Sequence, residues 1–122
     1  MGTHAVVAIE VDNKVYRAIY VHYDGDLAGS ALYKYHNSYE GALALVNGGD
    51  VVSVMETLDK CEPYGSKPRT GLSLYDVLIS IRAQTEYIYV WKGGQWMFGR
   101  YAGQALASIL HIDAAGEKRM VP

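Results

Sequence analysis

Residues 85–101 read TEYIYVWKGGQWMFGRY, and this stretch carries the most specific structural signal in the chain. Two runs of β-branched and aromatic residues flank Gly93-Gly94, a pair that favours a two-residue turn between antiparallel strands. A turn at these glycines also sets the register of the hairpin. The expected cross-strand pairs are Trp91 with Trp96, Tyr89 with Phe98, Tyr87 with Arg100, and Ile88 with Gly99.

The two faces of this hairpin differ in chemistry because side chains alternate along a strand. One face, which we call the aromatic face, carries Tyr87, Tyr89, Trp91, Trp96 and Phe98 and ends at Arg100. The opposite face is aliphatic and compact, and we expect it to be the core side. Two interpretations of the aromatic face stay open: a helix buries it, or it is exposed and grips a partner.

A second hairpin is predicted near the N-terminus. Residues 5–11 and 14–23 are rich in Val, Ile and Tyr, and Asp12-Asn13 is the expected turn between them. This turn would place Glu10 and Arg17 on one side of the hairpin, close enough to pair. The other side, the expected core side, would gather Val7, Ile9, Val11, Tyr16 and Tyr20.

Capping residues and helical spacing predict two short helices after this hairpin. Asp26 is the expected N-cap of a helix that runs to about His36. Ser38 is the expected cap of a second helix, which ends at Gly48-Gly49.

Later elements complete the predicted fold. Residues 50–55 read as a strand, and residues 60–69 read as a loop because they contain two prolines and a glycine. Ser73 and Asp76 form a capping-box-like pair at the start of a clear helix, and a last short helix is expected over residues 104–111. The sequence therefore predicts one α+β domain over residues 1–122, with 113–122 as a frayed tail. Its antiparallel sheet would have about five strands, from two hairpins plus one strand, with three to four short helices packed on it.

Composition excludes several classes of protein. About half of the 122 residues are hydrophobic, enough for a real core without metals or disulfides, and the single cysteine rules out an internal disulfide. The net charge of -2 argues against non-specific nucleic-acid binding, and no stretch is long and apolar enough to span a membrane. We expect a cytoplasmic protein in which Cys61 is an exposed thiol in the 60–69 loop.

Eleven tyrosines against one phenylalanine indicate that many rings are only half buried. A buried tyrosine hydroxyl needs a hydrogen-bond partner, so tyrosine is favoured where one end of the ring meets water. Half-exposed rings are typical of binding surfaces. They are also found on the outer faces of ordinary small sheets.

Residues 20–26 are the strongest candidate for chemistry, because a strand there ends in a turn with one imidazole and two carboxylates. His22 could act as a general base that Asp24 or Asp26 orients. The simpler interpretation makes Asp24-Gly25 a turn, Asp26 a helix cap and His22 a hydrogen-bonded residue of the sheet. Pairing in the hairpin would bring His4 near His22, but we predict no metal site and no cofactor.

These residues also carry a resemblance to a known family. Met1-Gly2-Thr3, the strand at 8–10, His22-Tyr23-Asp24-Gly25 and Gly49-Asp50 resemble a group of small bacteriophage and prophage proteins of unassigned function. The chain departs from that group at His4-Ala5, at Tyr23 and at Asp26-Leu27. The resemblance implies a phage-encoded protein that acts in a bacterial cytoplasm, and it implies no activity or cofactor.

The expected function is that of a binding protein that sequesters or inhibits a host factor, in defence or metabolism. The residues expected to bind are Tyr87, Tyr89, Trp91, Trp96 and Arg100, with His22, Asp24 and Asp26 as a second patch. One alternative is a binder of a small molecule or nucleotide, which would stack a base on the rings and meet phosphate with Arg100 or Arg17. The other is a small hydrolase that uses His22 with Asp24. An exposed sheet edge would also allow a homodimer.

Overall fold

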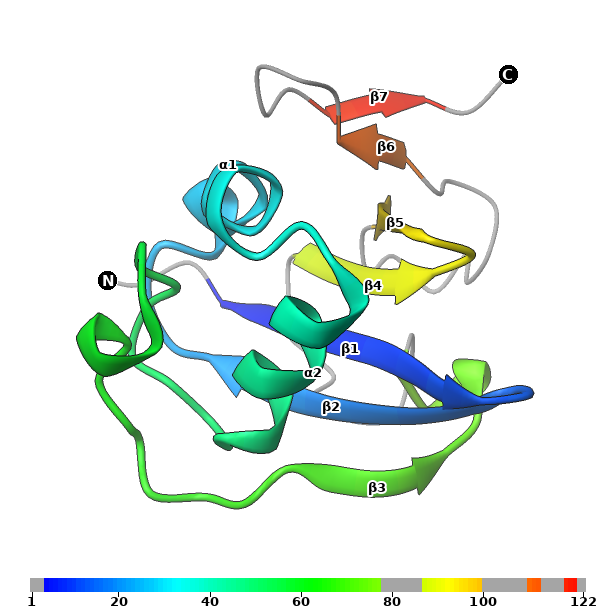
Figure 1. Ribbon diagram of the computed structural model, residues 1–122, viewed down its shortest axis with the longest axis horizontal. Coiled ribbons are helices and arrows are strands. Elements are labelled where there is room, and N and C mark those ends of the chain that lie inside the picture. The colour runs from blue at the N-terminus through cyan, green and yellow to red at the C-terminus, as the bar shows by residue number, and fades with distance from the viewer. Residues whose placement is uncertain (1–3, 78–86, 100–109, 113–117, 121–122) are drawn as a thin grey trace.

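The computed structural model describes residues 4–77, 87–99, 110–112 and 118–120 of the chain (Figure 1). One sheet runs through the molecule in the order β3-β2-β1-β4-β5-β6-β7. Its first five strands form a mixed sheet on which two α-helices pack, and β6 (Leu110–Ile112) and β7 (Lys118–Met120) extend it. The α+β class is confirmed, whereas the predicted purely antiparallel sheet is wrong. Two α-helices are found among the described residues, in place of the predicted three to four.

The parallel contact lies at the centre of the sheet. Strand β1 (Ala5–Asp12) pairs antiparallel with β2 (Val15–Val21) and parallel with β4 (Tyr87–Lys92). A parallel neighbour requires a long crossover, which here includes both helices and β3 (Arg69–Leu72). Local patterns predict that both hairpins form, but they carry no information on how two hairpins join.

The predicted hairpin at Gly93-Gly94 is confirmed. Strand β5 (Gln95–Gly99) pairs with β4 in the expected register, with Trp91 opposite Trp96 and Tyr89 opposite Phe98. Both glycines have positive φ angles, 65° and 82°, as the favoured two-residue hairpin turn requires. Arg100 lies outside the described residues.

The N-terminal hairpin forms with a register one residue away from the predicted one. Glu10 pairs with Tyr16 and Ala8 with Ala18, and a bulge near the turn is accompanied by a left-handed Lys14 (φ 58°). A shift of one residue moves side chains to the other face of a sheet. Tyr16 and Tyr20 therefore pack with Val6 and Ala8, away from Val7 and Ile9.

The predicted pairing of Glu10 with Arg17 is also wrong. Glu10 accepts a hydrogen bond from the Tyr16 hydroxyl (3.3 Å) and lies 3.6 Å from the Lys92 ammonium. The Arg17 guanidinium donates to the Asn47 side chain at the end of a helix. The bulge thus separates two charges that the predicted register would have joined.

Helices α1 (Gly25–Tyr35) and α2 (Tyr39–Asn47) cover one face of the sheet (Figure 1). Ser38 caps α2 as predicted, because its hydroxyl accepts from the Gly41 amide. Asp26 does not cap α1, since the N-cap is Asp24 and Asp26 lies in the first turn. Among the described residues, no helix is long and apolar enough to cross a membrane.

Both faces of the sheet are buried. The aromatic face packs under α1 and α2, with Tyr89, Trp91, Trp96 and Phe98 at most 6% exposed. Tyr89 donates to the Gly25 carbonyl (2.8 Å) and the Trp96 indole donates to the His36 carbonyl (3.0 Å). The hypothesis of an exposed aromatic face is therefore wrong for these four rings, and Tyr87 is half buried.

Leu74 and Val77, in the helical turn that follows Ser73, pack on the opposite face. Ser73 and Asp76 form the predicted reciprocal capping pair, at 2.9 and 3.1 Å, and residues 74–77 are helical. Val77 packs on Val6 and Ile88 in the second core cluster. Residues 78–86, over which the sequence predicts the rest of this helix, lie outside the described residues.

Two further predictions are corrected. Residues 50–55 do not form a strand, because only Val51 makes β-bridges, and the fifth strand is instead β3. Strands β6 and β7 occupy positions for which the sequence predicts the end of a helix and a frayed tail. Residues 104–109 of that predicted helix lie outside the described residues.

Replacement of Trp96 by Ala should lower the free energy of unfolding by about 3–5 kcal/mol, because the ring is buried and its N–H is bonded. Urea unfolding followed by circular dichroism measures this loss. The control is Tyr75→Ala, at a ring that is 63% exposed, which should change stability by only about 0.5 kcal/mol. Equal effects of the two substitutions would contradict the burial of the aromatic face.

Candidate functional site

A long ordered loop over residues 50–66 is the most distinctive part of the surface, seen as the green segment at the left of Figure 1. Its ends meet: the Asp50 amide donates to the Ser66 carbonyl (2.9 Å) and the Tyr64 amide donates to the Asp50 carbonyl (2.8 Å). Its regular structure is one 3-10 turn, η1 (Leu58–Lys60). Long loops with joined ends in compact domains are usually functional.

The backbone of this loop continues the sheet past the end of β2. The Val51 amide donates to the Tyr20 carbonyl (3.1 Å), and the Val51 and Val52 carbonyls accept from the His22 and Tyr23 amides (3.1 and 2.8 Å). These bonds fix the first part of the loop against the strand end that the sequence analysis singled out.

The side chain of Asp50 ties the loop to two strands. This carboxylate is only 4% exposed and accepts from the Tyr20 amide (2.8 Å) and from both terminal nitrogens of Arg69 (2.9 and 3.4 Å). The neighbouring Gly49 has φ 91°, and a Cβ there would lie 2.3 Å from the Ser66 carbonyl oxygen. The loop is therefore closed by a buried charge beside a position where only glycine fits.

The middle of the loop is held by Cys61 and His36. The Cys61 sulfur accepts from the Met55 amide (3.2 Å), and His36 Nε2 donates to the Met55 carbonyl (2.7 Å). Cys61 is only 6% exposed, so the prediction of an exposed thiol is wrong. The physical reason is the turn η1, which folds the thiol inward against Met55.

Burial raises the pKa of the Cys61 thiol above its ordinary value of 9.0. The Met55 amide opposes this shift, and the negative charge of Asp59 adds to it. Cys61 is therefore a neutral thiol at physiological pH. A neutral, buried thiol is a poor nucleophile.

His22 lies in a cluster of rings beside the loop. Its imidazole stacks on Tyr64 of the loop, with ring centroids 3.6 Å apart, and meets the edge of Tyr20 at 5.0 Å. His4 Nδ1 donates to the His22 carbonyl (2.8 Å), which confirms that His4 lies near His22. Tyr23 and Tyr64 are each nearly half exposed, at 47% and 48%.

Asp24 and Asp26 serve the turn and the helix start. Asp24 has a left-handed φ of 57°, and its carboxylate accepts from the Ser53 hydroxyl (3.3 Å). Asp26 is exposed in the first turn of α1, where a carboxylate is favourable. Among the residues that the structure describes, no three His, Cys, Asp or Glu side chains form a group that could hold a metal ion.

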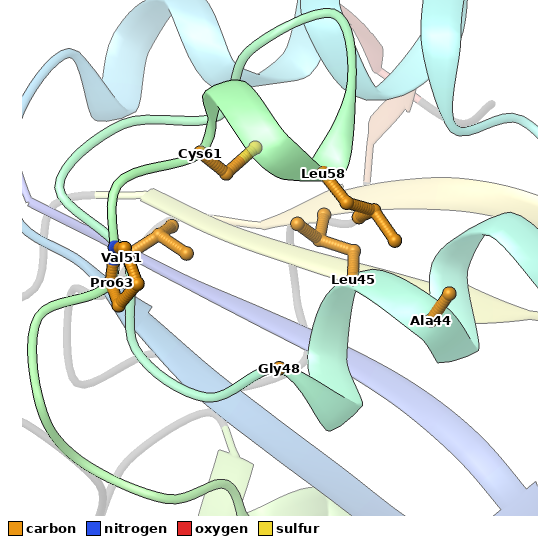
Figure 2. A pocket seen from close by; sticks show the side chains of 7 residues that line it. All are labelled: Ala44, Leu45, Gly48, Val51, Leu58, Cys61 and Pro63. Atoms are coloured by element: carbon orange, nitrogen blue, oxygen red, sulfur yellow. The ribbon is translucent and has the colours of Figure 1, made fainter.

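A small apolar pocket opens between α2 and the loop (Figure 2). Leu45, Val51 and Cys61 are buried and form its floor, whereas Ala44, Gly48, Leu58 and Pro63 are exposed and form its rim. Its volume is about 160 Å³. In Figure 2, Leu58 on η1 projects toward Leu45 on α2 across this space.

The sequence analysis placed His22 and Asp24 at this surface but missed most of the loop. The sequence predicts Met55 at the end of a strand and no role for Leu58, whereas in the structure these apolar side chains are 42% and 48% exposed. The available signal was the length of the stretch from Gly49 to Pro68, which has no sustained helical or strand period.

Comparison with known proteins gives no match, since no family model, curated protein or solved structure is significantly similar to the chain. The resemblance to phage proteins therefore stays a prediction.

Replacement of Asp50 by Ala should destabilise the fold by about 1–3 kcal/mol, because it leaves the buried Tyr20 amide without an acceptor, whereas the partly exposed Arg69 can turn to water. Urea unfolding measures this loss. Asp59→Ala, at an exposed carboxylate of the same loop, should cost only about 0.5 kcal/mol. A loss as small at Asp50 would show that the carboxylate does not hold the loop.

Alkylation of Cys61 by iodoacetamide at pH 8 should be at least about tenfold slower in the folded protein than in urea, because the thiol is buried and its pKa is raised. The folded rate should keep rising with pH above 9.0, where the unfolded thiol is already titrating. Asp59→Asn should move this profile to lower pH by removing a negative charge. Equal rates in buffer and urea would contradict the burial of Cys61.

Proposed function

We propose that the protein is a binding module that engages a partner protein through the 50–66 loop and the adjacent Tyr23. The observation that carries this proposal is the combination of a tightly fixed loop with exposed apolar side chains. Tyr23, Met55, Leu58 and Tyr64 each expose between 42% and 48% of their surface. Large, rigid, half-exposed side chains are the usual anchors of protein interfaces.

The fixed backbone supports this function energetically. Binding costs less when the loop is already held in one conformation, because less conformational entropy is lost. The hydrogen bonds of Asp50, Val51, Val52 and Cys61 supply this rigidity. The exposed rings then meet a partner without a large ordering cost.

In keeping with the resemblance to phage proteins, we propose that the partner is a bacterial host protein, in defence or metabolism, and that binding sequesters or inhibits it. Tyr23, one of the residues that carry the resemblance, lies at this surface. The aromatic face is not part of this proposal, because its rings are buried.

Binding of a small nucleotide is the second candidate. The support for it is the set of rings around His22, since bases stack on such rings. Of the two arginines expected to meet phosphate, Arg17 lies in the described part of the chain. Its guanidinium already donates a hydrogen bond to the Asn47 side chain, which makes it a weaker phosphate ligand. Thermal stabilisation by nucleoside phosphates, together with a co-purified ultraviolet-absorbing ligand, would favour this candidate over a protein partner.

The hydrolase hypothesis has less support. The hydrogen bond that the Asp24 carboxylate receives from a side chain comes from Ser53, and the His22 ring is packed on Tyr64 and Tyr20. General-base catalysis needs an imidazole within reach of a substrate proton. A turnover that His22→Ala abolishes would reverse this ranking.

The double variant Tyr23→Ala/Tyr64→Ala should lose capture of the partner from nuclease-treated bacterial lysate by at least about tenfold, the equivalent of about 1.4 kcal/mol. Mass spectrometry of the retained proteins measures the loss. Tyr75→Ala is the matched control, because this tyrosine is exposed on the helix of the opposite sheet face. Circular dichroism establishes that both variants are folded. Equal capture by wild type and both variants would overturn the proposed surface.

A further inference from the structure

The pocket between α2 and the loop has the chemistry of a site for one apolar group. Its floor is made by Leu45, Val51 and the Cys61 sulfur, and all three residues are buried (Figure 2). Burial keeps the thiol neutral, and its sulfur is already engaged by the Met55 amide. The floor therefore offers no counter-charge to a charged group, and burying an unpaired charge there would be costly.

The size of the pocket limits what it can hold. Its volume is about 160 Å³, and an apolar protein cavity of about 150 Å³ is large enough to bind benzene. One leucine, methionine or phenylalanine side chain matches this space. The exposed rim of Ala44, Leu58 and Pro63 leaves the space open to a side chain that enters from outside.

The charge of the adjacent loop distinguishes one class of partner from others. Residues 55–64 carry three carboxylates and one ammonium, and Lys60 is paired with Glu56 at 3.5 Å. Asp59 and Glu62 have no ion-pair partner among the described residues. The Asp59 charge also lies near enough to the pocket to act on the Cys61 thiol. A basic residue close to the entering side chain would complement this field.

We propose that this pocket receives one aliphatic or aromatic side chain of the partner protein, flanked by a Lys or Arg residue that faces Asp59. This inference rests on the proposed function and deepens it, because it states the chemistry of the segment that the loop recognises. The pocket binds the apolar side chain, and the negative charge of Asp59 favours apolar segments that have a basic residue beside that side chain.

Three short peptides test the proposal directly: acetyl-Arg-Leu-Arg-amide, acetyl-Arg-Ser-Arg-amide and acetyl-Glu-Leu-Glu-amide. Each is titrated into 15N-labelled full-length protein, and the amide shifts of residues 44–48, 58 and 61 are followed. The first peptide should give saturable shifts and bind about tenfold more tightly than either of the others, because only it has both the apolar side chain and the basic flanks. Equal binding of all three would overturn the proposal.

Two variants separate the pocket from the rest of the surface. Ala44→Trp, at an exposed rim position of α2, should fill the mouth of the pocket and abolish the Arg-Leu-Arg shifts. Asn37→Trp, at an exposed position outside the pocket lining, is the matched control and should leave them unchanged. Asp59→Asn should weaken Arg-Leu-Arg binding but not the binding of acetyl-Gly-Leu-Gly-amide.

The outcomes also distinguish this inference from the function on which it rests. Absence of saturable shifts at the pocket, or unchanged shifts in Ala44→Trp, would overturn the pocket as an anchor site. Partner capture that depends on Tyr23 and Tyr64 would still support the binding module, since those residues do not line the pocket. If the peptide binds the pocket but partner capture does not depend on Tyr23 and Tyr64, the pocket stands as a peptide-binding site and the proposed tyrosine surface is overturned.

Discussion

The buried carboxylate of Asp50 is the constraint on which the surface of this protein depends. It accepts hydrogen bonds from the backbone of β2 and from Arg69 of β3, and its own backbone closes the 50–66 loop. A buried charge is tolerated only when such partners surround it. Asp50 therefore joins β2, β3 and the loop, and this keeps the exposed side chains of the loop in fixed positions.

The second organising feature is a sheet that is buried on both faces. The helices α1 and α2 cover the aromatic face, and Leu74 and Val77 pack on the other. This explains why β1 is apolar at nearly every position, without the alternation of a strand that has one wet face. It also explains why the tyrosines that remain exposed come from helices, turns and the loop.

The sequence was sufficient for the elements whose signals are local. Gly93-Gly94 predicts the β4–β5 register because both residues must adopt positive φ angles. Ser38, Ser73 and Asp76 predict helix starts because their side chains bond amides only a few residues away. In each case the interaction that decides the structure lies within the window that the pattern covers.

The errors have the opposite origin. The register of the first hairpin depends on a bulge and on Lys14, which has a left-handed backbone conformation. Lysine rarely adopts this conformation, so the sequence does not predict it. The parallel contact of β1 with β4 joins residues that are far apart in sequence. The sequence predicts the part of the candidate site around His22 and Tyr23. It does not predict Tyr64 beside His22, or the pocket, because both depend on the path of a loop that has no helical or strand periodicity.

The parallel pairing of β1 with β4 also has a consequence for folding during synthesis, because β1 cannot complete its pairing until β4 has been made. Strands β1 and β2 and both helices precede β4 in the chain, so β1 has an open, apolar edge until β4 is synthesised. Such edges pair readily with other chains, and contacts of high sequence separation form slowly. The nascent protein therefore passes through a stage in which a strand at the centre of the final sheet is open to pairing with other chains.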